Sequence, residues 1–269
     1  MFNITRNGLD AISKELGVIS NNIANANTTA FKKSRTEFVD LYSKALSSNP
    51  KAKTGLGTVL QGTQKIMKQG SPILTDSALD LSVSGKGFFI LSPKEGADPR
   101  FTRDGSFSLN AQGNLITTEG FNVAGYAIDE AGNRNFSAAV PLKVPLSIES
   151  DGKVLLLSGL NVNNRGVIET TYGLNTIIER GQIALAKFNN EIELKSKGAN
   201  TYQATQKSGE QILGTAMSSN FGEILSGALE SSNTNISGEM INLIKTQQAF
   251  NGNARILQSN VEVTRRLMG

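Results

Sequence analysis

The chain has 269 residues and contains neither cysteine nor histidine, which excludes disulfides, the standard Cys/His zinc sites and catalytic triads that use either residue. Its formal net charge of +4 comes from scattered lysines and arginines, with no basic run interleaved with aromatic residues, so nucleic-acid binding is not indicated. The length suits a stalk and one body of ordinary domain size.

The first thirty residues contain an apolar repeat of seven residues. One set of positions is Phe2, Leu9, Leu16, Ile23 and Ala30, and the second set is Thr5, Ile12, Ile19 and Ala26. This spacing predicts a helix with one narrow apolar seam, of the kind that packs against another helix. Periodicity alone is equally compatible with an ordinary surface helix on a globular core.

A polar motif follows within the same predicted helix. Residues 21 to 32 read NNIANANTTAFK, followed by KSRTEFVDLY. This closely resembles the N-terminal signature of the bacterial flagellar rod and hook proteins, in which an Asn-Asn-Ile/Leu-Ala-Asn run leads to Thr-x-Gly-Phe-Lys. Ala30 stands where the family usually has Gly, so the helix either runs a little further or turns differently before Phe31. For Asn21, Asn22 and Asn25, polar contacts between subunits and plain solvation are equally expected.

The stretch after the motif keeps helical spacing through Phe38, Leu41 and Tyr42, and Ser43 to Thr54 reads as a linker around Pro50. The family places a variable segment here, long in the stiff distal rod and short in the bendable hook. In this chain the segment is intermediate to short. We expect residues 43–54 to reach a neighbouring subunit only in part.

The body is predicted to begin at Ile73 with two strands. Leu79, Leu81 and Val83 alternate with polar residues, as in a half-buried strand, and residues 88–91 form a more buried one. The Gly85-Lys86-Gly87 turn between them is a weak phosphate-loop candidate, because no Gly-Lys-Ser/Thr followed by a helix is present.

Short strands with turns at residues 104–105, 112–113 and 119–120 come next. A calcium loop at Asp104 is a weaker alternative, because the later carboxylate is missing. The segment from Gly85 to Tyr126 also resembles the second signature of the flagellar rod and hook family: Gly-x-Gly-Phe-Phe, then Thr-Arg-Asp-Gly-x-Phe and a Gly-Asn-Leu hairpin.

Residues 127–180 match the family less tightly, and their role is not predicted. Residues 148–157 suggest another hairpin. Hook proteins usually carry a large extra domain hereabouts, and this chain has room for little or none of it, which favours a rod member. The later Gly-Thr-Ala…Asn-Phe-Gly and Gly-Ala-Leu-Glu-x-Ser-Asn motifs are instead similar to the hook.

A second seven-residue repeat begins at Ile236. Its positions are Ile236, Leu243, Phe250, Leu257 and Thr264, interleaved with Met240, Gln247, Ala254, Val261 and Met268. Asn235 or Ser237 can cap this helix, and Glu239 in its first turn faces the positive end of the helix dipole.

Together these observations predict an α+β fold, in which long N- and C-terminal helices pair as a coiled-coil-like stalk carrying an inserted, mainly antiparallel β domain. The expected boundaries are 1–32 and 233–269 for the helices, 33–72 for a linker and extended segment, and 73–232 for the body. The expected seam contacts are Leu9, Ile12, Leu16, Ile19, Ile23, Leu243, Phe250, Leu257 and Val261. The family signature positions are Asn21, Asn22, Ala24, Asn25, Phe31, Lys32, Gly87, Phe88, Phe89, Arg103, Asp104 and Gly105.

The resemblance implies a structural subunit of the flagellar axis that stacks helically into a hollow tube, either a rod protein or a compact hook protein. Its implied partners are many copies of itself, adjacent rod and hook proteins and, during secretion, the type III export apparatus. No catalytic, cofactor or metal site is expected. Neither a cleavable signal nor a membrane-spanning stretch is apparent, and the resemblance implies export to the basal body, with a possible extension to the hook.

Two readings from other classes are weaker. A hydrolase based on a carboxylate pair would draw on Asp76, Asp80, Asp104 and Glu119, but no motif brings two of them together. A β-rich surface binding module would need clustered exposed aromatic side chains, and the chain has no tryptophan.

Overall fold

The structure, a computed structural model, describes residues 2–42, 55–92, 98–128, 139–150, 153–173, 176–218 and 220–268. The chain divides into two compact units. The terminal unit comprises Met1–Asn27, Lys32–Met67 and Thr234–Gly269, and the body unit comprises Thr28–Phe31 and Lys68–Asn233. The predicted linker at residues 43–54 lies outside the described residues.

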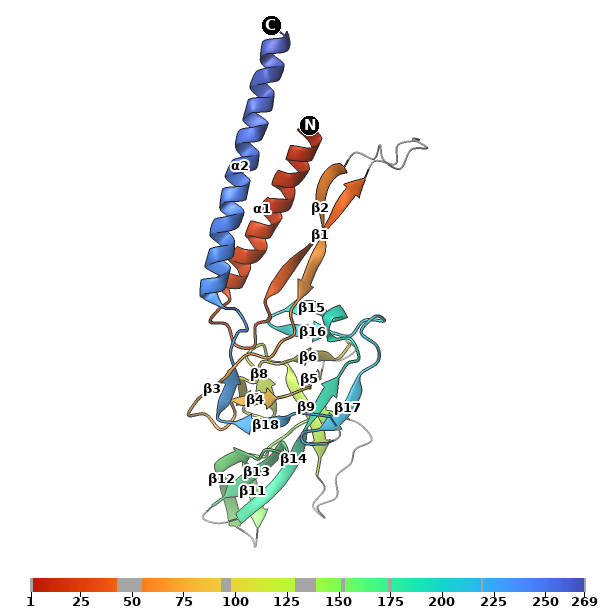
Figure 1. Cartoon of the computed structure of the whole chain (residues 1–269). Helices are drawn as coiled ribbons and strands as arrows, with labels where there is room; N and C mark the ends of the chain where they lie inside the picture. Colours follow the sequence, from red (N-terminus) through yellow and green to blue (C-terminus); the bar gives the residue numbers. More distant parts are fainter. Residues whose placement is uncertain are drawn as a thin grey trace. The chain divides into compact units, whose positions relative to one another are not determined.

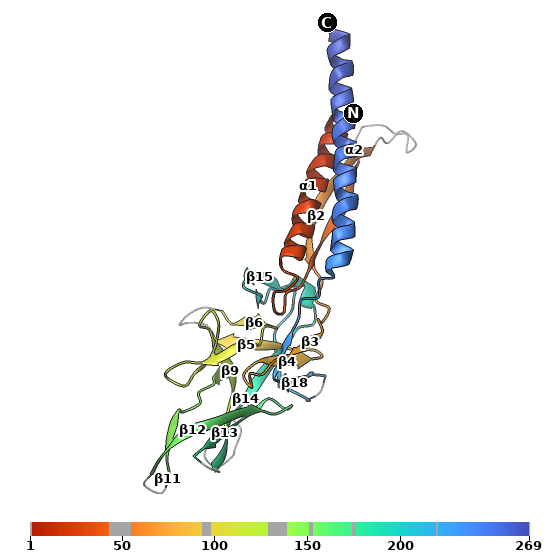
Figure 2. The same cartoon turned by 90° about the vertical axis from the view of Figure 1, so that its left-hand side faces the viewer.

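The terminal unit contains two α-helices and a β-hairpin. Helix α1 spans Phe2–Ala24 and helix α2 spans Ile236–Met268. Strand β1, Ser34–Tyr42, pairs antiparallel with β2, Gly55–Lys65, with two irregularities in the register. Figures 1 and 2 show the two helices side by side, with the end of α2 extending past the start of α1. The Asn235 side chain accepts a hydrogen bond from the Gly238 amide at 3.2 Å, which confirms Asn235 as a cap of α2.

The strand β1 corrects one expectation from the sequence. Residues 33–42 have apolar residues at helical spacing, yet Phe38 pairs with Leu60 and Val39 with Val59 in the hairpin. The helix ends at Ala24, and the following segment is rich in residues that suit strands, including Thr36, Phe38 and Val39. Three apolar positions are too few to distinguish a helical repeat from a strand.

The body unit consists of short antiparallel strands. They are β3 Pro72–Leu74, β4 Leu81–Ser84, β5 Phe88–Ser92, β6 Arg100–Thr102, β7 Phe107–Leu109, β8 Leu115–Thr117, β9 Asn122–Ala127, β10 Val140–Pro141, β11 Ser147–Ser150, β12 Lys153–Val162, β13 Val167–Tyr172, β14 Thr176–Lys187, β15 Lys195–Gly198, β16 Thr201–Gln203, β17 Ile212–Thr215, β18 Glu223–Ser226 and β19 Ala228–Glu230, with a 3-10 turn η2 at Glu191–Glu193. A thirteen-stranded sheet contains β5 to β17, with the main order β11-β12-β13-β14-β9-β5-β6-β16-β15. The pairs β18–β4 and β19–β3 complete the described strands of this unit.

Strand β5 is covered on both faces. Phe89 packs in the main core, where its ring centroid lies 5.0 Å from that of Phe107. Phe88 points into a second cluster, 6.2 Å from Phe188 and 6.0 Å from Tyr202. Burial on both faces explains the continuous apolar run in this strand and confirms its prediction as a buried strand.

Several local predictions can be compared with the strands. The hairpin at residues 148–157 is confirmed by the pairing of β11 with β12. The turns at Gly113 and Gly120 join β7 to β8 and β8 to β9, and both glycines have a φ of +79°. The turn at residues 104–105 joins no hairpin, because β6 pairs with β5 and β16 whereas β7 pairs with β8.

The fold-class prediction is wrong. The two α-helices among the described residues hold 23 and 33 residues, and most of the rest of the described chain is antiparallel β structure. Strands are not confined to an inserted domain, because β1 and β2 belong to the terminal unit with the helices. A seven-residue repeat is visible in sequence over long helices, whereas strands of three to five residues leave too short a pattern to be counted, so the sequence overstated the helical part.

Candidate assembly site

The predicted seam of α1 lies on the covered side of that helix. Ile19 is 5% exposed, and Leu9, Ile12, Leu16 and Ile23 are half-buried. Half-buried positions still present apolar surface, so α1 combines contacts inside the terminal unit with surface that remains accessible.

The covered side of α2 differs from its predicted seam in one of the two sets. Leu243, Phe250 and Leu257 are half-buried, but Val261 is 46% exposed. The most covered residues are instead Glu239, 5% exposed, and Thr246, 7% exposed. The second set of covered positions on α2 therefore begins at Glu239, one residue before Met240. Its most covered residues, Glu239 and Thr246, are polar.

Hydrogen bonding accounts for the start of this polar stripe. Further along, α1 and α2 are in ordinary contact, because a Cβ atom placed on Gly8 of α1 would lie 3.6 Å from the Asn253 side-chain nitrogen of α2. Near the start of α2, the Asn22 side-chain nitrogen donates to Glu239 at 3.2 Å and to the Ser34 carbonyl at 2.8 Å. The Ser34 amide donates back to Asn22 at 2.9 Å.

The Lys33 ammonium completes this group with an ion pair to Glu239 at 3.0 Å. These interacting groups come from α1, β1, α2 and the residue just before β1, and together they offset the cost of burying Glu239. Asn22 is 2% exposed and forms these hydrogen bonds within its own chain, whereas the sequence suggested either contacts between subunits or solvation. The Asn25 side chain donates to the Asn21 carbonyl at 2.9 Å and so satisfies a backbone carbonyl in the last turn of α1.

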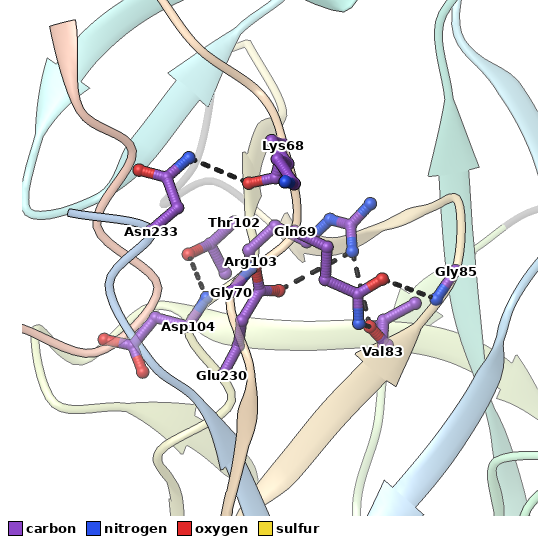
Figure 3. Close-up of polar contacts among 10 residues, drawn as sticks. All are labelled: Lys68, Gln69, Gly70, Val83, Gly85, Thr102, Arg103, Asp104, Glu230 and Asn233. Carbon is purple, nitrogen blue, oxygen red and sulfur yellow. Dashed lines mark hydrogen bonds and ion pairs between the residues drawn. The ribbon is translucent and has the colours of Figure 1, made fainter. Parts of the chain in front are cut away.

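A second polar group lies inside the body unit (Figure 3). The Arg103 guanidinium is 3.6 Å from the Glu230 carboxylate, 3.4 Å from the Val83 carbonyl and 4.9 Å from the centroid of the Phe88 ring. Glu230 also accepts a hydrogen bond from the Gly70 amide at 2.9 Å. Burial lowers the pKa of Arg103, and the Glu230 charge partly opposes that shift.

Three segments meet around this ion pair. The Ala30 amide donates to the Glu230 carbonyl at 2.7 Å, and the Asn233 amide donates to the Phe31 carbonyl at 3.2 Å. The Asn233 side chain donates to the Lys68 carbonyl at 2.8 Å (Figure 3). The body unit therefore binds together residues 28–31, 68–70 and 228–233, which are far apart in sequence.

Gln69, in the segment 68–70, forms hydrogen bonds with strand β4 and with the turn that follows it. Its side chain donates to the Val83 carbonyl and accepts from the Gly85 amide, both at 3.0 Å (Figure 3). No motif in the sequence indicated a function for Gln69, Glu230 or Asn233. The burial of Glu230 has no signal in the sequence, because Glu230 ends the Gly-Ala-Leu-Glu motif and is followed by two serines.

The remaining signature residues lie at structurally demanding positions. Gly87 has a φ of +135°, and a Cβ on Gly105 would lie 1.7 Å from the Leu81 carbonyl oxygen, so neither tolerates a side chain. Phe31 and Lys32 are buried, whereas Ala24 is exposed at the end of α1. Ala30, at the position where the family usually has Gly, adopts a φ of +55°.

The four carboxylates considered for hydrolysis do not form a set. Asp104 and Glu119 line one cavity of about 270 Å³, but Asp104 accepts hydrogen bonds from the Ser106 amide and hydroxyl. The backbone of Asp80 forms an isolated β-bridge with that of Ser106.

Among the described residues there is no group of three or more Asp and Glu side chains placed to hold a metal ion. In the same part of the chain, no helix is both long and apolar enough to cross a membrane.

Comparisons with known proteins cover nearly the whole chain. Three family models match: flagella basal body rod protein over residues 2–32, flagellar hook protein FlgE/F/G D1 domain over residues 82–198, and flagellar basal body rod FlgEFG protein C-terminal over residues 225–268.

Individual relatives divide into two groups by coverage. The chain is 33% identical to the flagellar basal-body rod protein FlgG of Buchnera aphidicola subsp. Schizaphis graminum, over 98% of this chain and 96% of the relative. It is 29% identical to FlgG of Agrobacterium fabrum, over 97% and 95%. The flagellar hook protein FlgE of Helicobacter mustelae is 43% identical, but over 47% of this chain and 30% of the hook protein.

Proposed function

Since the chain belongs to the flagellar hook and basal-body rod protein family and is a structural subunit of the flagellar axis, we propose that it is a rod subunit of the FlgG kind. The observation that carries this proposal is the coverage of the two groups of relatives. The similarity to rod proteins extends over nearly the full length of both chains, whereas the similarity to hook proteins takes in 25 to 30% of the hook chain. A compact hook protein remains the alternative that the experiment below distinguishes.

The proposed action is self-assembly into a hollow tube that transmits torque and lets exported subunits pass. The terminal unit supports this, because its helices keep much apolar surface uncovered within one chain. The proposed assembly positions are Leu9, Ile12, Leu16, Ile19, Ile23, Leu243, Phe250, Leu257 and Val261. Because most of these side chains are already half-buried and Ile19 is 5% exposed, neighbouring copies would stabilise each by less than the about 1.5–3 kcal/mol gained by burying a fully exposed one.

The proposed partners are many copies of this chain, the adjacent rod and hook proteins and, before assembly, the type III export apparatus. Export through a narrow channel requires a chain that unfolds readily. A terminal unit with few fully buried apolar residues suits that requirement.

Deletion followed by electron microscopy of isolated hook–basal bodies tests this proposal. Cells that lack the chain should have truncated rods and no hooks, and the intact gene should restore both. Complete rods without hooks would identify a hook subunit. Intact flagella in the deletion strain would contradict a function in the flagellar axis.

A further inference from the structure

A short stretch near the N-terminus, Thr28–Phe31, belongs to the body unit, whereas the residues on both sides of it, Met1–Asn27 and Lys32–Met67, belong to the terminal unit. We call this stretch the strap. Ala30 is completely buried and Phe31 is 6% exposed. The strap is thus an early segment of the chain that is bound by parts of the body that come much later in the sequence.

Hydrogen bonds from two distant segments hold the strap. The Asn200 side-chain amide donates to the Thr29 carbonyl at 2.7 Å. The Ala30 amide donates to the Glu230 carbonyl at 2.7 Å, in a stretch that we call the β19 segment (residues 228–233). Because both partners are needed, the strap can dock only when the turn at Asn200 and the β19 segment are already in place.

The bonds from the β19 segment to the strap are separate from those that hold this segment in the body. The Asn233 amide donates to the Phe31 carbonyl at 3.2 Å, but the Asn233 side chain donates to the Lys68 carbonyl (Figure 3). The Glu230 carbonyl accepts from the strap, while the Glu230 carboxylate forms the ion pair with Arg103 (Figure 3). The β19 segment therefore keeps its side-chain bonds to the body when the strap leaves it.

Backbone strain lies on both sides of the bond between Asn200 and the strap. Ala30 has a φ of +55°, Ala199 of +44° and Asn200 of +51°, in the left-handed region that is unfavourable for a residue with a Cβ atom. Opening the strap lets Ala30 leave this region. Strained backbone of this kind is typical of clamps and switch regions, so the closed strap is held at a smaller net free energy than its burial alone would give.

We infer that the strap is a latch, which opens and closes on a body that stays folded. Because its closure needs the β19 segment, the latch closes last, after nearly the whole chain is present. The use of the latch rests on the proposed self-assembly: a chain whose N-terminal segment docks last can enter a growing tube with its body already folded. The opening itself is a property of the single chain.

Hydrogen exchange of the purified full-length chain, followed by NMR, tests the latch. The Ala30 amide reports on the strap, the Ala228 amide on the β19 segment and the Ile183 amide on the main sheet, and all three donate to main-chain carbonyls. The protection factor of Ala30 should be at least about 100-fold smaller than that of Ile183. Low urea should hardly change Ala30 exchange, because local opening exposes little surface, whereas exchange at Ile183 and Ala228 should rise with urea.

Two substitutions should shift the latch in opposite directions. Asn200→Asp keeps the side-chain shape and the tolerance of left-handed backbone but removes the donor to Thr29, so Ala30 exchange should become about 10-fold faster while Ile183 exchange stays unchanged. Ala30→Gly relieves the strain of the closed strap, so the Asn233 amide, which donates to the strap, should exchange about twofold more slowly.

Thr118→Asp is the matched control. The exposed Thr118 lines the same cavity as Asn200, so the variant adds the same charge nearby without removing a bond to the strap. It should leave the exchange of Ala30 unchanged. An increase as large as that of Asn200→Asp would overturn the assignment of Asn200 as the residue that holds the latch closed.

The outcomes separate this inference from the proposed function. Equal protection of Ala30 and Ile183, with the same dependence on urea, would overturn the latch, because the strap would then leave only when the body unfolds. Equal protection of Ala30 and Ala228 would also overturn it, since the strap and the β19 segment would open as one unit. Normal flagella in cells without the chain would overturn the proposed function, and the exchange measured on the single chain would still decide whether the latch exists.

Discussion

The body unit and the terminal unit bury different kinds of residue. In the body, Leu81, Phe89 and Leu185 are completely buried, and even the Arg103–Glu230 ion pair is shielded from water. In the helices of the terminal unit, the described residues that are most covered are mostly small or polar. They are Thr5, Ala11, Ile19, Asn22, Glu239 and Thr246.

This difference indicates where the free energy of each unit comes from. A closed apolar core stabilises the body within one chain. The terminal unit relies on hydrogen bonds around Glu239 and on apolar surface that is only half covered, so within one chain apolar burial contributes less to its stability than to that of the body.

The largest expected effect comes from breaking the ion pair in the body. Glu230→Ala leaves the Arg103 charge buried without its carboxylate partner and removes the acceptor of the Gly70 amide. We expect the free energy of unfolding of the body to fall by about 3–5 kcal/mol. Urea unfolding of the full-length chain, followed by circular dichroism, measures this.

Glu223→Ala is the matched control, because Glu223 is a half-buried carboxylate in the neighbouring strand β18 with no resolved ion pair among the described residues. It should change the free energy by less than about 1 kcal/mol. A loss for Glu230→Ala no larger than that of this control would contradict the importance of the buried pair.

The second effect concerns the covered side of α1. Ile19→Asp places a carboxylate where Ile19 is 5% exposed, and should destabilise the terminal unit by about 2–4 kcal/mol. Secretion into the medium should continue, because an exported chain need not be folded, whereas incorporation into rods should fail.

Ser20→Asp adds the same charge at the next, exposed position of α1 and should leave motility unchanged. Motility and basal bodies of normal appearance in the Ile19→Asp strain would remove Ile19 from the proposed assembly positions.

The sequence predicted the long helices because their repeats run over many residues, and strand β5 because its consecutive apolar residues suit a strand that is buried on both faces. It did not predict the hairpin of β1 and β2, since Phe38 and Leu41 also fit a helical spacing. It could not place Glu239 on the covered side of α2, because hydropathy favours Met240, and the burial of Glu239 depends on Asn22 and Lys33 from distant segments. The Arg103–Glu230 pair likewise joins residues that only the folded chain brings together.

A third prediction uses pH to probe the aromatic cluster of the body. Burial, with a smaller effect of the Glu230 charge, raises the pKa of Tyr202 to about 12 from its usual value near 10. The folded state keeps this proton in a range where the unfolded state loses it, so stability that is present below pH 10 is lost as the pH rises toward 12.

Tyr202→Phe removes this titration while keeping the ring. Between pH 9 and pH 11, the natural chain should lose about 1.4 kcal/mol more of its unfolding free energy than the variant, as judged by urea titrations at each pH. The other tyrosines and the lysines titrate in both proteins and cancel in the comparison. Parallel pH profiles for the two proteins would mean that Tyr202 is not held in its neutral form by burial.

The smallest effect should have the opposite sign in the two units. Ala30 has a φ of +55°, a region that costs a residue with a Cβ about 1–2 kcal/mol, and its amide is held by the Glu230 carbonyl at 2.7 Å. Ala30→Gly relieves that strain but loses a buried methyl group and gains freedom in the unfolded chain. We therefore expect a net stabilisation of the body of about 0.5 kcal/mol, and at most about 1 kcal/mol.

Ala11→Gly, in the regular part of α1, relieves no strain and should destabilise the terminal unit by about 1 kcal/mol or more. Thermal unfolding of both variants beside the natural chain measures the two signs, and destabilisation by Ala30→Gly would show that the segment before Phe31 can adopt another backbone conformation without strain.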